Sequence, residues 1–292
     1  MKVHILGTSS APHPSKSGRG GTGVLVSIDK TRILFDCGPG VTEKLVRLGI
    51  DLGEISTLFL THHHYDHTSD IGLFVLGRWE WSLFHSMGGL KLAPQLAVYG
   101  PPRTKHMIEL LFGQEGFFQD DVLSRINGEG EKLYALHGVK TPIDPPMPVT
   151  LDIQAGDFLE KPLFKINTVE AEHCQPYLIP LAFRFDSSEG SVVFSGDTGI
   201  CERVTKLASG ADLLIHDCSQ TEETRVSMGY EKLHSSPITI GKVAAEAGVK
   251  KLVALHFGMG LESGVLSTFE DKIRKNYDGE ILIANDMDII DV

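Results

Sequence analysis

Residues 61–67 read Thr-His-His-His-Tyr-Asp-His and carry the densest chemical signal in the chain. Within six of these residues lies the pattern His-x-His-x-Asp-His, which supplies four candidate metal ligands. Imidazole nitrogens and carboxylate oxygens are ligands that suit Zn²⁺. The apolar run 55–60 comes directly before them and predicts a buried strand. A turn at the end of a rigid strand can direct several side chains at one point, so the pattern indicates a metal site rather than a surface cluster of histidines.

Three more residues of ligand type follow short apolar runs elsewhere in the chain. His173, Asp197 and His256 each stand shortly after a run that predicts a strand. A lone histidine in such a place is more often a hydrogen-bonded structural residue. Four strand-end sites in one chain are poorly explained as independent structural features, so we expect them to meet at one centre.

This ordered set of motifs resembles the metallo-β-lactamase superfamily, and within it the ribonuclease Z-like branch. The resemblance covers nearly the whole chain and runs through the motifs at 5–8, 34–40, 60–67 and 255–257. It implies a four-layer αββα sandwich, in which two sheets pack face to face and helices cover the outer faces. It also implies a single domain over residues 1–292, with the site at an edge where strand ends meet. Because one scaffold hosts many reactions, the resemblance says less about the substrate.

The resemblance further implies a centre with two Zn²⁺ ions per chain, for which manganese or iron would be alternatives. It assigns one ion to His62, His64 and His173, the other to Asp66, His67 and His256, and a bridging position to Asp197. Two ions about 3.5–4 Å apart can share a hydroxide and lower the pKa of bound water to about 7. Asp66 is expected to serve catalysis as well as metal binding. The intervening His63 and Tyr65 are expected to point elsewhere.

Three other residues match the ribonuclease Z-like branch. Asp36 is expected to orient a metal-binding histidine. His234 falls where the branch carries a histidine that contacts the phosphate or protonates the leaving group, and Asp217, beside His216, falls where the branch usually has Glu. An Asp–His pair can hold an imidazolium, which is a good acid for an alkoxide leaving group. The structural alternative for His234 is a residue that merely precedes the helix start at 235–237.

Composition indicates which partners and which cellular compartment to expect. The chain has 292 residues, 41% of them hydrophobic, and a formal net charge of −11. A strongly acidic protein is a poor general binder of nucleic acid, whose affinity rests on Lys and Arg contacts to phosphates. No apolar run reaches the length of a membrane span, and the N-terminus predicts a first strand rather than a signal peptide. The four cysteines form no Cys-x-x-Cys pair, so a reducing cytoplasm is the expected compartment.

Three segments outside the motifs carry further expectations. Residues 71–84 predict a helix whose Trp79 and Trp81 belong either to the core or to a pocket wall. Residues 113–149 show no regular pattern, and a structureless loop of that length is uncommon unless it has a function. We therefore expect an insertion at about 113–149 that forms a lid over the metals or an assembly contact, such as that of a homodimer. Residues 280–283 and 288–291 predict a closing hairpin or strand pair.

The expected function is that of a hydrolase in which a bridging hydroxide attacks an ester of a small molecule. Phosphodiesters, sulfate esters and lactones all fit this chemistry. A ribonuclease Z-type tRNA 3′-endonuclease is the alternative. That enzyme carries a long arm after the position of His173, whereas here the apolar run 178–185 follows almost at once. The missing arm and the acidic charge disfavour tRNA as a partner.

Two other classes of function are less well supported. A non-catalytic binding module would be expected to have lost ligands, and all seven ligand positions are intact. The flavodiiron oxidoreductases replace a histidine of the first motif with Glu, and this chain has His64. Both observations favour hydrolysis.

Overall fold

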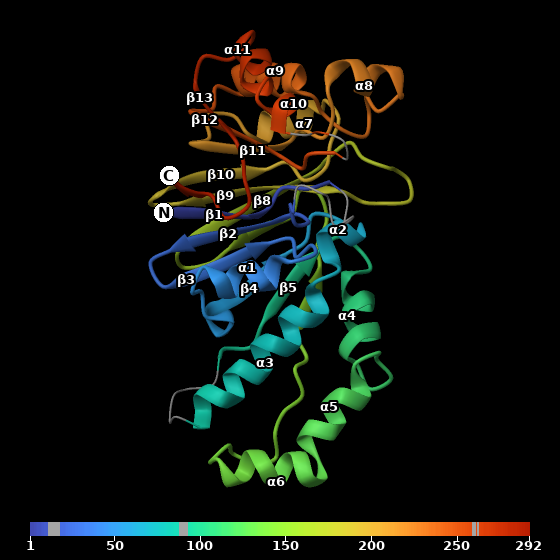
Figure 1. The fold of residues 1–292 in the computed structure, drawn as a ribbon, viewed down its shortest axis with the longest axis vertical. Coiled ribbons are helices and arrows are strands. Elements are labelled where there is room, and N and C mark those ends of the chain that lie inside the picture. The colour runs from blue at the N-terminus through green and yellow to red at the C-terminus, as the bar shows by residue number, and fades with distance from the viewer. Residues whose placement is uncertain (11–17, 88–92, 259–260, 262) are drawn as a thin grey trace.

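The computed structural model describes residues 1–10, 18–87, 93–258, 261 and 263–292. In it, two mixed sheets pack face to face, and helices cover the outer face of each (Figure 1). This arrangement confirms the expected αββα sandwich. Among the described residues, no helix combines the length and apolar character that a membrane crossing requires.

The first sheet has the strand order β14-β1-β2-β3-β4-β5-β6. Its strands are β1 (Lys2–Gly7), β2 (Gly23–Ile28), β3 (Thr31–Phe35), β4 (Ile55–Phe59), β5 (Ala97–Gly100), β6 (Val149–Asp152) and β14 (Ile289–Asp291). Strands β3 to β6 pair in parallel. The carboxyl ends of these four strands therefore share one edge of the sheet.

The second sheet has the strand order β13-β12-β11-β10-β9-β8-β7. Its strands are β7 (Phe158–Glu160), β8 (Phe164–Glu170), β9 (Leu181–Ser187), β10 (Gly190–Phe194), β11 (Leu213–Asp217), β12 (Lys251–Leu255) and β13 (Glu280–Ile283). Strands β10 to β13 are parallel. As in the first sheet, consecutive strand ends are brought to a common edge.

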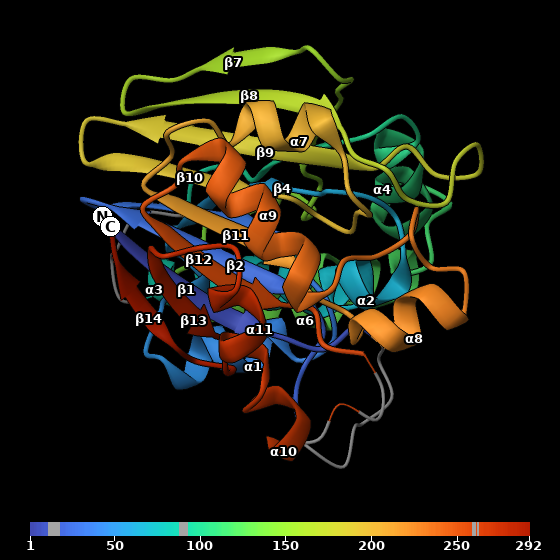
Figure 2. The same ribbon diagram turned by 90° about the horizontal axis from the view of Figure 1, so that it is seen from above.

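Helices lie outside both sheets (Figure 2). Those that follow strands of the first sheet are α1 (Val41–Arg47), α2 (Tyr65–Thr68), α3 (Ile71–Met87), α4 (Thr104–Phe112), α5 (Gln119–Ile126) and α6 (Gly128–Leu136), with a short 3₁₀ turn η1 (Leu52–Glu54). Those of the second half are α7 (Glu202–Leu207), α8 (Glu222–Ser227), α9 (Pro237–Ala247), α10 (Ser263–Leu266) and α11 (Phe269–Arg274). Helix α9 starts sharply because Ser236 forms a capping box with Thr239 and Pro237 occupies the first turn.

Aromatic rings fill the space between the sheets. Phe35 stacks on Phe59 with ring centroids 5.2 Å apart and on Phe194 at 3.9 Å. Phe183, from the opposing sheet, is fully buried and lies 5.5 Å from the ring of Phe59. Phe35, Phe59 and Phe194 are the last residues of β3, β4 and β10, so the packed rings form a rigid base for the side chains that follow.

Replacing Phe183 with alanine should remove the centre of this base. We expect the free energy of unfolding to fall by about 3–5 kcal/mol, because the fully buried ring leaves a cavity that the sheets cannot close. Urea denaturation measures the loss. The control is Phe117→Ala, since Phe117 is 80% exposed and its loss should cost no more than about 0.5 kcal/mol. A loss below about 1 kcal/mol for Phe183→Ala would contradict the packing described.

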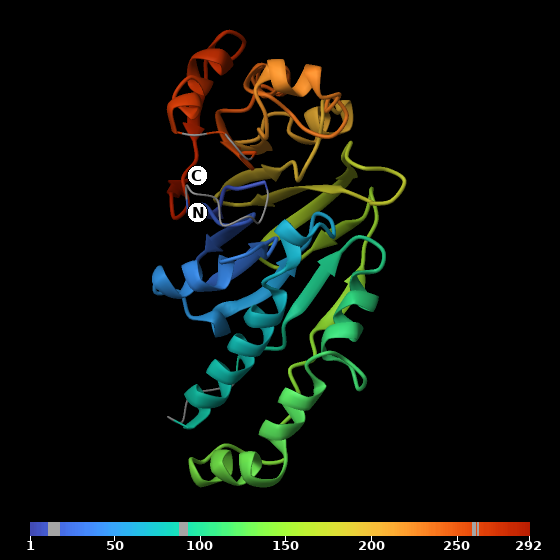
Figure 3. The ribbon, with the colours of Figure 1, turned by 45° about the vertical axis from the view of Figure 1, so that its right-hand side comes forward.

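The segment 113–149 is more regular than its sequence indicates, because it contains α5 and α6. A small apolar cluster explains its order, in which Tyr134, Val139 and Ile143 pack against Leu83 of α3. Figures 1 and 3 show α5 and α6 at the end of the molecule remote from α2. Within one chain, the segment therefore does not form the lid over the metal ligands that its sequence suggested.

The end of the chain also differs from expectation. Strand β13 pairs in parallel with β12 in the second sheet, whereas β14 crosses over and pairs with β1 in the first. The predicted closing hairpin is therefore wrong, because the two strands belong to different sheets. The two chain ends lie side by side, and the Val292 amide donates to the Met1 carbonyl at 3.1 Å.

Candidate metal centre and catalytic residues

The first sheet contributes the histidine motif through the end of β4. The chain leaves β4 at Phe59, places His62 in a fully buried position, and enters α2 with His64 at its N-cap. Asp66 and His67 follow in that helix and are buried. A short helix after a strand thus turns four successive ligand-type side chains toward one region.

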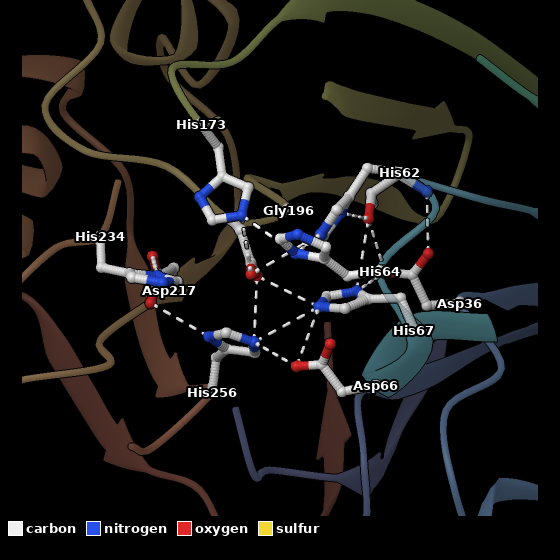
Figure 4. A network of polar contacts seen from close by, with 12 residues as sticks. Asp36, His62, His64, Asp66, His67, His173, Gly196, Asp217, His234 and His256 are labelled. Atoms are coloured by element: carbon white, nitrogen blue, oxygen red, sulfur yellow. Dashed lines mark hydrogen bonds and ion pairs between the residues drawn. The ribbon is translucent and has the colours of Figure 1, made fainter. Parts of the chain in front are cut away.

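The second sheet contributes the remaining ligand-type residues, each after the end of a different strand. His173 follows β8, Asp197 follows β10 and His256 follows β12. All three are at most 2% exposed. Figure 4 shows His173 and His256 pointing toward the histidine motif, and Oδ2 of Asp197 lies 3.7 Å from Nε2 of His62. The structure therefore brings all seven predicted ligands together.

One group of four contains His62, His64, His173 and Asp197. The Nδ1 atom of His64 lies 3.0 Å from Nε2 of His62 and 3.2 Å from Nε2 of His173. The Oδ2 atom of Asp197 lies 3.7 Å from Nε2 of both His62 and His173. Three ring nitrogens and one carboxylate oxygen therefore converge on one point.

A second group of four contains Asp66, His67, Asp197 and His256. The Nε2 atoms of His67 and His256 lie 3.3 Å apart, and the Oδ1 atom of Asp197 lies 3.3 Å and 3.1 Å from them. Asp66 places Oδ2 3.3 Å from Nε2 of His256. Asp197 thus directs one oxygen to each group, which is the geometry that a bridging carboxylate requires.

The donor atoms of both groups fit divalent metal ions. Two imidazole nitrogens that both carry lone pairs repel each other at 3.0–3.3 Å unless a proton or a cation lies between them. Each group offers nitrogen and oxygen donors within 4.8 Å of one another. This mixed donor set is the type that zinc accepts.

Ionisation of the buried groups agrees with this interpretation. Burial lowers the pKa of His62, and the neighbouring His67 adds to the effect, so its ring is neutral. Burial also disfavours charge on His256, but Asp197 and the nearby carboxylates outweigh it and raise its pKa to about 10. The histidines around Asp197 overcome the cost of its burial and hold its pKa well below the usual value. The Asp197 carboxylate is therefore ionised, and either protonated histidines or a metal cation can balance its charge.

Further contacts fix the orientation of the ligand rings. Nδ1 of His67 donates to Oδ2 of Asp36 at 2.8 Å, which is the contact expected of Asp36. Thr61 donates to the same carboxylate from both its amide and its hydroxyl, each at 2.8 Å. Nδ1 of His173 donates to the Leu233 carbonyl at 2.7 Å. Because His67 and His173 make these bonds through Nδ1, Nε2 of each ring stays free to bind metal.

Asp217 holds two histidines at once. Its Oδ2 accepts from Nδ1 of His234 at 3.0 Å, and its Oδ1 lies 3.4 Å from Nδ1 of His256. The His234 ring lies 4.9 Å from that of His173 and 5.5 Å from that of His256. His216 instead bonds the backbone carbonyl of Asp217. The Asp–His pair is therefore Asp217–His234, at the border of the metal-ligand groups.

The two intervening residues of the motif point elsewhere, as expected. His63 bonds Thr104 Oγ1 at 2.8 Å through Nε2. Tyr65 is 58% exposed. Neither residue belongs to the ligand groups.

Residues 31–257 match the family described as the β-lactamase superfamily domain. The chain belongs to the metallo-β-lactamase superfamily. Relatives and neighbours in this superfamily include ribonuclease Z-like proteins. The chain is accordingly a metal-dependent hydrolase acting on ester bonds, and the fold implies a dinuclear metal centre.

Ribonuclease Z from Mycobacterium bovis (strain BCG / Pasteur 1173P2) is 28% identical over 298 residues, which cover 100% of this chain and 98% of that protein. The metallo-β-lactamase fold protein YhfI from Bacillus subtilis superposes with a TM-score of 0.72 at 19% identity, covering 99% of this chain and 98% of its own. Human tRNase Z, short form, has a TM-score of 0.67 at 20% identity, with 99% and 98% covered. The two structures show a shared fold.

These comparisons correct the argument against tRNA. The alignment with the mycobacterial relative spans 298 positions, and this chain fills 292 of them. The relative therefore has only a few residues without a counterpart in this chain. That relative therefore has no long arm after the position of His173 either. The missing arm does not separate this chain from a protein named ribonuclease Z, so the expectation that tRNA is an unlikely partner is not supported.

Sequence reasoning missed two groups that orient ligands. Thr61 precedes the histidine motif directly, and its bonds to Asp36 could have been suspected from that position alone. The carbonyl of Leu233 leaves no signal in a sequence, because any residue provides one. Leu233 stands next to His234. One segment therefore orients His173 and also places His234 at the border of the metal-ligand groups.

Elemental analysis tests the metal content of the centre. After zinc is added and unbound metal removed, we expect two zinc ions per chain, because seven ligands exceed the need of one tetrahedral ion. His173→Ala should lower the content toward one, since His173 belongs to the first ligand group alone. His137→Ala, at the exposed residue that follows α6, is the control. One ion per chain in the zinc-loaded protein would contradict a dinuclear zinc centre.

Proposed function

We propose that this protein is a cytoplasmic dinuclear-zinc phosphodiesterase whose substrate is a small phosphodiester. The metal ligands are His62, His64, Asp66, His67, His173, Asp197 and His256. Asp217 and His234 complete the catalytic machinery. Four free cysteines fit a reducing compartment.

The placement of His234 carries the proposal. Its Nδ1 is engaged by Asp217 at 3.0 Å, and its side chain is 19% exposed. Among the described residues, no hydrogen bond uses its Nε2. The ring therefore offers one protonated nitrogen to a substrate at the border of the metal centre. Such a group serves an ester whose leaving alkoxide must be protonated.

The ionisation of His234 supports the role of an acid. Burial disfavours the charged ring, but the Asp217 carboxylate outweighs burial, and the pKa of His234 is raised above its usual value. An imidazolium is then available near neutral pH. In the reaction it would donate the proton on Nε2 to the leaving oxygen, while Asp217 keeps the ring in place.

When bound, the two ions would supply an activated hydroxide and neutralise charge that develops on the phosphate. The protein's part is to hold the donors rigidly. Asp36 and Thr61 fix His67, the Leu233 carbonyl fixes His173, and Asp217 fixes His256. Asp66 would bind one ion through a carboxylate oxygen.

Two substrate classes fit this chemistry. The formal charge of −11 offers few cationic contacts to the phosphates of a polymer and favours a small phosphodiester. Processing of tRNA 3′ ends is the second candidate, favoured by alignment of the whole chain with a protein named ribonuclease Z.

A direct comparison of substrates separates these candidates. The zinc-loaded protein should hydrolyse bis(4-nitrophenyl) phosphate and 2′,3′-cyclic nucleotides, with kcat/KM at least equal to that for precursor tRNA. Release of 4-nitrophenolate and gel analysis of the tRNA measure the two rates at physiological salt.

Either of two results would overturn the proposal. Efficient, site-specific removal of a tRNA 3′ trailer, with poor turnover of small phosphodiesters, would make tRNA the substrate. Hydrolysis of sulfate esters or lactones in preference to both phosphodiesters would identify another ester class.

A further inference from the structure

A second cavity lies far from the metal centre, between the C-terminal half of α3 and the segment 138–148. Its volume is about 840 Å³. Apolar side chains dominate its wall, among them Trp79, Leu83, Leu96, Val139, Ile143 and Met147. A concave, mostly apolar pocket of this size with few polar groups is typical of a small-molecule site.

The cavity lies at the opposite edge of the first sheet from the metal ligands. Arg78 in its wall donates from Nε to the carbonyl of Ile55, the first residue of β4, at 2.8 Å. The histidine motif follows the other end of the same strand. The five residues of β4 separate the two sites by roughly 16 Å. The cavity is therefore not a subsite of the metal centre.

Arg78 is the unusual feature of this wall. Its side chain is only 7% exposed. It donates to two backbone carbonyls, from Nε to Ile55 and from Nη2 to Pro94. Within the described part of the chain, Nη1 makes no hydrogen bond and no carboxylate forms an ion pair with Arg78. The nearby Asp51 is shared with His85 at 3.5 Å and with the Gly53 amide.

A buried cation without a direct ion pair is rare, and the charge of the nearby Asp51 offsets only part of its desolvation. Burial lowers the pKa of Arg78 to about 10, which leaves the guanidinium charged at neutral pH. Lys140 also lines the cavity and is exposed. Asp144 lines it too, but its side chain is exposed and its carbonyl accepts from Trp79 Nε1 at 3.0 Å. Lys140 and Asp144 thus carry opposite charges at exposed positions, whereas the charge buried in the wall is that of Arg78.

We propose that this cavity binds an amphipathic anion, with the acidic group on Nη1 of Arg78 and the apolar body between Trp79 and the 138–148 segment. A medium-chain carboxylate has both features. A planar guanidinium can bind a carboxylate through paired hydrogen bonds. The proline-rich segment supplies a preformed wall.

Calorimetric titration of the zinc-loaded protein with decanoate and with decanol tests the two parts of the proposal. Decanoate should bind saturably at one molecule per chain and change the fluorescence of Trp79. Decanol has the same chain without the charge and should bind at least about tenfold more weakly, the usual effect of losing a charged hydrogen bond. Equal affinity for the two probes, or no saturable binding of decanoate, would overturn the proposal.

Two variants locate the binding. Arg78→Met should weaken decanoate binding by about tenfold or more while leaving decanol unchanged. Arg47→Met, on the exposed face of α1, is the matched control and should bind decanoate like the parent protein. Ser86→Phe places a ring in the cavity wall and should block both probes. Since it leaves both hydrogen bonds of Arg78 intact, this variant decides the location even where Arg78→Met fails to fold. Unchanged decanoate affinity in Ser86→Phe would place the binding elsewhere.

Discussion

Replacing Asp197 with alanine is expected to abolish hydrolysis and to deplete the protein of metal. Asp197 directs Oδ2 toward the first ligand group and Oδ1 toward the second, so its loss removes a ligand from both ions. It also removes the carboxylate that lies within 3.7 Å of four surrounding histidines. We expect kcat/KM to fall by on the order of 10³-fold or more and metal affinity by more than about 100-fold. Kinetics with bis(4-nitrophenyl) phosphate and elemental analysis measure the two effects.

Two comparisons make this result specific. Asp186→Asn alters an acidic residue on β9 that pairs with Arg184, away from the ligand groups, and should leave metal content unchanged. Asp197→Asn keeps the shape but not the charge and should retain more metal than the alanine variant. Full zinc content in Asp197→Ala would show that the carboxylate does not bridge the ions.

Replacing His234 should produce the second largest loss, and the size of that loss should depend on the leaving group. His234 stands outside the two ligand groups that contain Asp197, although its ring lies 4.9 Å from that of His173. Removal of a general acid costs about 10²–10⁴-fold when an alkoxide must be protonated. His234→Ala should therefore slow hydrolysis of a cyclic nucleotide by this factor. With bis(4-nitrophenyl) phosphate the loss should stay below about tenfold, since 4-nitrophenolate leaves without a proton.

The metal content of the variant distinguishes an acid from a ligand. His234→Ala should keep two zinc ions per chain, whereas Asp217→Asn should lose some zinc as well as activity, because Asp217 also holds His256. His137→Ala controls for the loss of a surface histidine. Equal rate losses on both substrates would assign His234 to phosphate binding, and loss of zinc would place it in the coordination sphere.

The metal centre was largely predictable from the sequence because its ligands are chemically distinct and each follows a strand. Hydrophobic runs indicate strands, and a His or Asp at the end of a run is visible without coordinates. The sequence could not show that Asp217 pairs with His234 rather than with its neighbour His216. That choice depends on the loop between α8 and α9, whose path is set by packing rather than by local pattern.

The parts that were not predictable depend on contacts between distant segments. Helix α6 has weak periodicity of its own and is ordered through Leu83 and the 138–148 segment. The two tryptophans of α3 also required the structure. Trp79 lines the second cavity, whereas Trp81 is 42% exposed on the outer side of the helix.

The crossing of β14 into the first sheet has a consequence for cotranslational folding. Strand β1 is made well before β14, yet one of its edges pairs with β14, at Val3 opposite Ile290. That edge stays open until β14 leaves the ribosome. An open strand edge is a template for pairing with other nascent chains. A strand that is made late thus closes one that is made early, and synthesis that stops before β14 would leave a chain with an exposed, aggregation-prone edge.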